Sequence, residues 1–110
     1  MKHPPKLTRK LVLEDPQRSP DGAGGYTETW VALGTLWAEV KSLTGRAAGD
    51  GLSLQKYRIT LRATPEGLAS RPRPDQRFRE NSRLYRIDAV AESGPGACYI
   101  TCFAVEEVSG

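Results

Sequence analysis

Apolar and polar residues alternate with a period of two along most of the chain, which predicts β-strands rather than helices. The clearest alternation lies in segment 55–63, where the apolar positions are Tyr57, Ile59, Leu61 and Ala63. The intervening positions carry a charge or a hydroxyl, and they are Lys56, Arg58, Thr60 and Arg62. We therefore expect one face of this strand in the core and the other face in water.

Five more segments predict strands, with less regular alternation: 7–14, 26–40, 76–80, 83–92 and 97–107. In the first, Leu11 and Leu13 should point inward and Glu14 should lie on the wetter face. In segment 83–92 the residues expected inward are Tyr85, Ile87, Ala89 and Ala91. Segment 97–107 is apolar on both faces, which indicates a central strand or a strand covered by a partner.

Residues 15–25 predict the turn between the first two strands. Pro20 presets its φ angle, Asp21 can close an Asx turn, and Gly22 accepts a positive φ. The strand that follows contains two tryptophans, Trp30 and Trp37, which lie on opposite faces unless Gly34 forms a β-bulge. The alternation leaves open which of the two is buried.

These segments together predict an all-β protein, a small antiparallel six-stranded barrel with long loops. Closure into a barrel removes exposed strand edges. Residues 1–110 are enough for a single domain. We expect a flexible tail at 1–6, a long glycine-containing loop at 43–54 and a second loop at 64–76 that is rich in proline.

Charge and composition fit a globular domain made in the cytoplasm. Hydrophobic residues make up 38% of the chain and charged residues 26%, and the net charge is +3 with a pI of about 9.1. This mild basicity permits proximity to DNA without requiring it. No apolar run is long enough to cross a bilayer, so we expect no membrane partner.

No catalytic or metal-binding constellation is visible in the sequence. The single histidine, His3, lies in the expected tail. Cys98 and Cys102 would lie about 13 Å apart on one strand, too far for a disulfide. Two thiols are also too few for a structural zinc site, and we expect both to be small buried hydrophobic residues. The prediction is a protein without enzymatic activity, metal or cofactor.

The basic residues form two groups, one on segment 55–63 and one around the second loop. They could form a solvated face, a groove that follows phosphates, or a subunit interface. We expect contacts between subunits through Arg58, Arg62, Arg77 and Arg86. The acidic partners on a neighbouring copy would be Glu14, Glu28, Glu39 and Glu92.

Several motifs occur in an order that is similar to one known family. They are Leu11-Val12-Leu13, Pro20-Asp21-Gly22-Ala23-Gly24-Gly25, Trp37-Ala38-Glu39-Val40, Gly45-Arg46, Arg58-Ile59-Thr60-Leu61-Arg62 and Leu84-Tyr85-Arg86-Ile87. In this order the chain resembles the small head-tail joining proteins of long-tailed bacteriophages, also called head-closure, stopper or adaptor proteins. These proteins occur in prophages and gene transfer agents as well. The chain departs from the family in its Ala- and Gly-rich loop after Arg46 and in its Pro-rich segment 64–74.

The resemblance implies a structural role at the head-tail interface of a virion or virion-like particle. Such proteins are β-barrels that form a ring, here six- or twelve-fold, which retains the packaged genome. The implied partners are other copies of the chain, an adaptor or portal ring, a tail-terminator ring, and double-stranded DNA that passes without sequence readout. The loop between the second and third strands would enter the channel, and it contains Gly45, Arg46, Ala47, Ala48, Gly49, Asp50 and Gly51.

A second hypothesis is an OB-like or SH3-like barrel that binds nucleic acid directly through its basic residues. Such a binder should show strong, salt-dependent affinity for DNA as a free monomer. A connector subunit should instead bind free DNA poorly and be present in purified particles.

Overall fold

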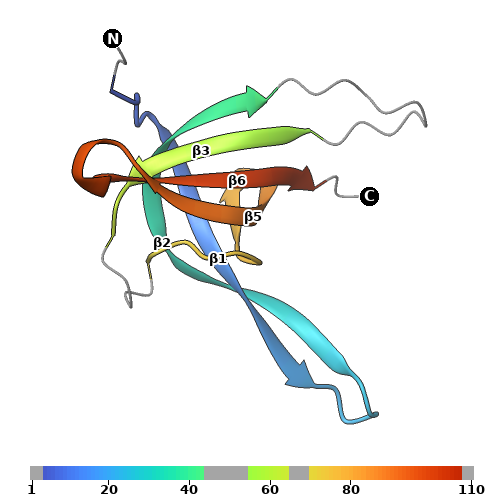
Figure 1. The fold of residues 1–110 in the computed structure, drawn as a ribbon. Coiled ribbons are helices and arrows are strands. Elements are labelled where there is room, and N and C mark those ends of the chain that lie inside the picture. Colours follow the sequence, from blue (N-terminus) through green and yellow to red (C-terminus); the bar gives the residue numbers. More distant parts are fainter. Residues whose placement is uncertain (1–3, 44–54, 65–69, 108–110) are drawn as a thin grey trace, which may run out of the picture.

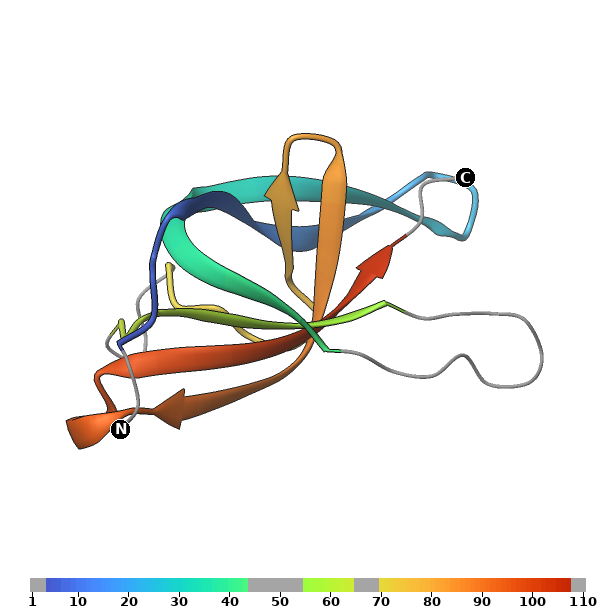
Figure 2. The ribbon, with the colours of Figure 1, turned by 90° about the horizontal axis from the view of Figure 1, so that it is seen from above.

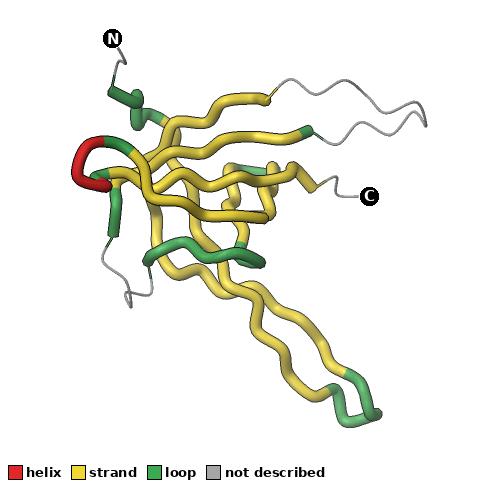
Figure 3. Tube along the Cα trace, in the orientation of Figure 1, coloured by secondary structure: helices red, strands yellow, loops and turns green. Residues whose placement is uncertain are grey.

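The computed structural model describes residues 4–43, 55–64 and 70–107, which form the predicted six-stranded antiparallel barrel (Figure 1). The strands are β1 (Arg9–Pro20), β2 (Tyr26–Leu43), β3 (Lys56–Arg62), β4 (Arg77–Glu80), β5 (Arg83–Ser93) and β6 (Tyr99–Glu107). A short 3₁₀ turn, η1 (Pro95–Ala97), joins the last two. Around the barrel the order is β1-β2-β3-β6-β5-β4, and β4 pairs with β1 to close it. Figure 3 shows how little of the described chain lies outside strands.

The core fills the barrel interior with alternate residues from all six strands. On β3 the inward residues are Tyr57, Ile59 and Leu61, as the alternation predicts. β6 pairs with β3 and β5, but every strand of a closed barrel has two neighbours, and Phe103 on the outer face of β6 is 39% exposed. The buried hydrophobic residues are Leu11, Leu13, Ala38, Tyr57, Ile59, Leu61, Phe78, Tyr85, Ile87, Ile100, Cys102 and Ala104.

β4 closes the barrel although it is only four residues long. Its central residue, Phe78, is fully buried and lies between Leu13 of β1 and Tyr85 of β5 in the ladder. Burial of such a side chain contributes about 1.5–3 kcal/mol. Closure therefore depends strongly on this one aromatic residue.

β1 is longer than the sequence predicts. The expectation of a turn over residues 15–25 is wrong, because β1 continues to Pro20 and the connection spans only residues 21–25. Beyond the barrel, β1 and β2 continue side by side as a two-stranded projection (Figures 1 and 2). A β-bulge precedes this projection, where Leu33 is the extra residue on β2.

A second bulge changes the inward face of β5. Ile87 pairs with Ala104 but Ala89 pairs with Phe103, so Asp88 is the extra residue. The extra residue reverses the alternation. Ala89 and Ala91, expected inward, are therefore exposed, and Val90 packs against the core instead.

The expected loops are described only in part. Residues 44–54 of the first loop and residues 65–69 of the second lie outside the described residues. The rest of the second loop is less exposed than expected, because Pro72 and Gln76 are buried in it. At the start of the described chain, the backbone N–H of Lys6 donates to Glu39 Oε2 at 2.9 Å.

Candidate interaction surfaces

The projection formed by residues 15–31 is the most exposed element of the described chain, and we call it the arm (Figure 1). Tyr26 is 70% exposed and Val31 is 46% exposed. An isolated two-stranded hairpin is only marginally stable in water. The arm therefore needs support from the barrel at its base, from its own turn, or from a partner.

The turn at the arm's tip is held by Asp21. Its Oδ1 accepts hydrogen bonds from the backbone N–H groups of Ala23 at 2.8 Å and Gly25 at 3.0 Å. These bonds lower the pKa of the Asp21 carboxyl. Gly22 and Gly24 adopt φ angles of 81° and 88°, which residues with a Cβ atom rarely adopt. The structure thus confirms the turn chemistry expected of Pro-Asp-Gly.

One face of the arm's base is held by Glu14. This residue is on the outer face, as expected, but it is only 6% exposed because the arginine side chains of the neighbouring strand β4 lie against its carboxylate. Its carboxylate accepts hydrogen bonds from Arg77 Nε at 2.7 Å and Arg79 Nε at 2.8 Å. Burial raises the Glu14 pKa, but the two guanidinium groups outweigh it, and the pKa is lowered overall. The Arg77 guanidinium also lies 4.0 Å from the ring centre of Trp30 on the arm.

The opposite face of the base is held by Asp15. Its Oδ1 accepts a hydrogen bond from Gln76 Nε2 at 2.9 Å, and Gln76 Oε1 accepts one from the Arg73 backbone N–H at 2.8 Å. Adjacent strand residues point to opposite faces. Glu14 and Asp15 therefore fix the arm from both sides, and we call these contacts the clamp. A clamp on two faces sets the direction of the arm relative to the barrel.

The clamp explains the burial of Arg77 and settles the tryptophans. Arg77 points to the outer side of β4, but its side chain is only 15% exposed and is paired within its own chain. Trp30 is half-buried beneath Arg77, whereas Trp37 is 56% exposed. The sequence does carry a signal for the clamp, since Arg77 and Arg79 flank inward-facing Phe78 and so share its outer side. It does not reveal that Glu14 lies opposite them.

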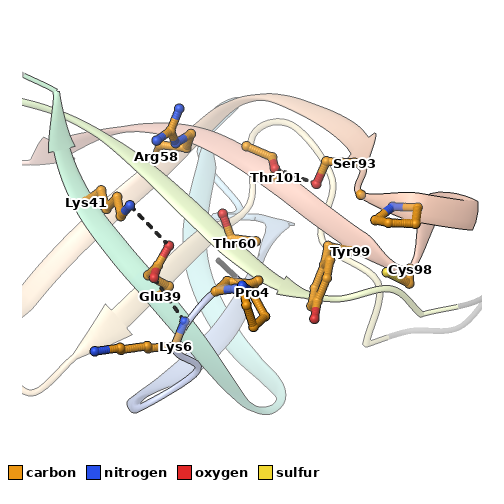
Figure 4. Close-up of a pocket in the computed structure, with 13 residues that line it drawn as sticks. Pro4, Lys6, Glu39, Lys41, Arg58, Thr60, Ser93, Cys98, Tyr99 and Thr101 are labelled. Carbon is orange, nitrogen blue, oxygen red and sulfur yellow. Dashed lines mark hydrogen bonds and ion pairs between the residues drawn. The ribbon is translucent and has the colours of Figure 1, made fainter. Parts of the chain in front are cut away.

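A shallow groove of about 1420 Å³ crosses the outer face of β2, β3 and β6 (Figure 4). Thr60 and Thr101 contribute to its floor. Segment 4–6 borders one side, and segment 94–98 with Tyr99 borders the other. The Ser93 and Thr101 hydroxyls are hydrogen-bonded to each other at 2.9 Å. We call this feature the outer groove.

Positive charge predominates along the outer groove. Lys6, Lys41 and Arg58 line it, against one carboxylate, Glu39. Glu39 already accepts the Lys6 backbone N–H and lies 3.8 Å from Lys41 Nζ. Arg58 is exposed and forms no ion pair with any described residue.

The four arginines predicted at an interface do not form one cluster. Arg58 and Arg62 share the exposed face of β3, as expected. Arg86 is on β5, where its side chain is 3.7 Å from Asp75, and Arg77 belongs to the clamp. The predicted channel residues Gly45 to Gly51 lie outside the described residues.

An ionic and aromatic network that the sequence did not indicate lies near the β4–β5 turn. Arg83 donates to Glu106 Oε2 at 2.8 Å and to the Tyr57 hydroxyl at 2.7 Å. The hydrogen bond to Glu106 raises the Arg83 pKa, and burial raises that of Tyr85 to about 12. The Tyr57 and Tyr85 rings meet edge to face at 5.0 Å. Since all these groups are paired with one another, the network holds strands together rather than presenting a reactive group.

The cysteines differ from each other in exposure. Cys102 is buried as expected, and burial raises its pKa to about 12, whereas Cys98 is exposed, contrary to expectation. Cys98 precedes β6 and lies in the turn after η1, where the strand alternation does not apply. Both are free thiols. Within 4–43, 55–64 and 70–107, no group of three or more metal-ligating side chains is found, and no helix could span a membrane.

Comparisons with known proteins agree with the resemblance seen in the motifs. Among solved structures, a chain from "Virion of native gene transfer agent (GTA) particle" is 49% identical, with a TM-score of 0.79 over 96% of this chain and 98% of that chain. Protein SF1141 from Shigella flexneri 2a, at 19% identity and a TM-score of 0.68 over 94% of this chain and 96% of that chain, shares the fold. A search of curated proteins found no match. A family model described as phage head completion protein matches residues 2–107. The chain therefore belongs to the phage head completion protein family.

Proposed function

We propose that this protein is a structural connector between head and tail in a phage or gene transfer agent particle. Copies of the chain form a ring between the portal or adaptor and the tail, retain the packaged DNA and let it pass during ejection. The observation that carries the proposal is the family match over residues 2–107, which the 49% identical chain in a gene transfer agent virion supports.

The structure suits a ring subunit in two respects. A closed barrel hides its strand edges, which limits uncontrolled association between copies. The arm and the outer groove are different surfaces of one chain, and a ring is built from such unlike surfaces when the rotation between neighbours closes. The adaptor or portal ring and the tail-terminator ring would contact the two sides of this ring.

Copy number tests the ring. Quantitative mass spectrometry of purified particles should find six or twelve copies of the chain per particle. Without the chain, heads should not be joined to tails and should lose their packaged DNA. A single copy per particle would refute the ring, and tailed particles of normal yield without the chain would refute the connector role.

The loop after β2 extends the proposal to DNA retention. Residues 45–51 connect β2 to β3 and contain three glycines and two alanines, which allow several copies to crowd near an axis. Shortening the loop by removing residues 47–50 should leave assembly intact but let DNA leak from tailless heads. Nuclease sensitivity of the packaged DNA measures this leak. If the packaged DNA in heads with the shortened loop stayed fully protected from nuclease, the loop would have no role in retaining DNA.

Direct nucleic acid binding is the alternative, and the exposed cations of β3 favour it. Lys56, Arg58 and Arg62 lie along one outer face, and none forms an ion pair with a described residue. A binder with three phosphate contacts would lose affinity with a log–log salt slope of about −2.7. We expect the free chain to bind duplex DNA weakly. Tight binding by the monomer with that slope would favour the alternative.

A further inference from the structure

We propose that the arm of one copy lies in the outer groove of the next copy around the ring. The inference rests on the proposed function for the presence of several copies in one particle. It assigns a partner to two exposed features, the arm and the outer groove, that are otherwise unexplained within one copy.

The dimensions of the two features match. The outer groove spans β2, β3 and β6, which are neighbours in the barrel. Two spacings between strands of about 4.8 Å each give a floor about 10 Å wide. The arm is a ribbon of two strands with about 5 Å between the backbones, so it can lie across this floor.

The charges of the two features are complementary. Between residues 17 and 29 the arm carries one basic residue, Arg18, and two acidic residues, Asp21 and Glu28. The outer groove carries three basic residues against one acidic residue. Of the four glutamates expected to meet arginines on a neighbour, Glu14 is buried in the clamp. Glu28 remains on the exposed arm. Its Oε2 lies 3.8 Å from Nε of Arg18 in the same chain, which is a long ion pair.

Aromatic residues occur on both surfaces. Tyr26 is exposed near the tip of the arm, and Tyr99 borders the outer groove. Tyrosines are frequent among the residues that dominate binding energy at interfaces. The clamp also favours docking, because an arm whose direction is already fixed loses less conformational freedom when it binds.

Cys98 provides a built-in probe, since it is exposed and borders the outer groove, whereas Cys102 is buried. The variants Ala23→Cys and Thr27→Cys each place a thiol on the exposed tip of the arm. In particles that carry either variant, a short bis-maleimide should join the arm of each copy to Cys98 of the next. Because each copy then has two different linkage points, denaturing gels should show a ladder of dimers, trimers and higher multiples.

Two controls define the result. Adding Cys98→Ser to either variant should abolish the ladder. Ser82→Cys, on the exposed β4–β5 turn, should give no ladder because that position is not on the arm. Dimers that persist with Cys98→Ser would indicate contacts between two arms and would overturn the inference.

The outcome also separates this inference from the proposed function. Several copies per particle by mass spectrometry without a ladder from either variant would overturn the arm contact and leave the connector ring intact. A single copy per particle would overturn both. A ladder that depends on Cys98 would establish the contact between unlike surfaces.

Discussion

At the scale of single residues, Glu14 shows how a buried carboxylate can orient a whole element. The carboxylate lies under Arg77 and Arg79, and Arg77 in turn covers Trp30. Leaving either partner alone in this buried position is costly, because an unpaired buried charge keeps its desolvation penalty. The residues of the clamp therefore depend on each other, and the arm depends on them.

We expect Glu14→Gln to destabilise the protein by about 2–3 kcal/mol. The variant leaves Arg77 without its carboxylate, and the loss should be smaller than the 3–5 kcal/mol of a fully buried pair because Arg79 is half-exposed. Urea unfolding measures the change. Glu92→Gln, at an exposed position, is the control and should change stability by less than about 0.5 kcal/mol. Equal stability of the two variants would show that the clamp contributes little.

The two thiols should react very differently. We expect Cys98 to react with a maleimide in the native protein at pH 8, because it is exposed. Cys102 should react only after unfolding, because it is buried and its pKa is raised to about 12. Mass spectrometry should therefore count one label on the native chain and two on the unfolded chain. Two labels on the native chain would show that the barrel opens around β6.

At the scale of elements, bulges decide which way strands face and where they go. The bulge at Leu33 lies where β1 and β2 leave the barrel and become the arm. The bulge at Asp88 turns Ala89 outward beside Phe103 and Ala91 outward beside Thr101. Each inserts one residue in one strand, which bends the strand and resets its alternation. The outer surface of the barrel is thus set by single-residue insertions.

Two arginine reversals should separate an interface role from a role in the clamp. Arg62→Glu should leave the barrel folded, because the side chain is exposed on β3, but it should block head-tail joining. Arg77→Glu should lower stability by more than about 3 kcal/mol, since it removes a buried partner and adds a like charge beside Glu14. Thermal unfolding and the yield of tailed particles measure the two effects. A normal yield of tailed particles with folded Arg62→Glu would show that Arg62 is not part of the interface.

At the scale of the whole molecule, carboxylates paired with arginines link strands that are far apart in sequence. Glu14 links β1 to β4, Glu80 pairs with Arg9, and Glu106 pairs with Arg83. The pKa of each of these carboxyls is lowered, for Glu80 and Glu106 chiefly by the arginine hydrogen bond. The stability of the closed barrel therefore depends on these carboxyl groups being ionised.

We expect this coupling to make the protein sensitive to acid. A carboxyl whose pKa is lower in the folded state contributes its full stability above the unfolded value, about 4.3 for glutamate. That contribution is lost as the pH falls through the lower folded value. Unfolding free energy should thus be constant from about pH 6 to 7 and should fall below about pH 4. Glu14→Gln should show a smaller fall over the same range, and an identical fall would exclude Glu14 as a source.

The sequence by itself determined the strands, the fold class and the family. Alternation placed Tyr57, Ile59 and Leu61 in the core, because a period of two can bury only one face of a strand. The turn at Asp21 was equally local, since Asp and Gly form it with their own backbone. The motifs in their order identified the family that the comparisons confirm.

Only the tertiary structure decided how these strands use their outer faces. Glu14 meets Arg77 and Arg79 across 63 and 65 residues of sequence, and Asp15 meets Gln76 across 61. The length of β1, the burial of Glu14 and the exposure of Trp37 depend on which strands become neighbours and where a bulge resets their register. Periodicity records which face of a strand is apolar. It does not record which strand lies beside it, because barrel closure brings together residues with no local relation in the chain.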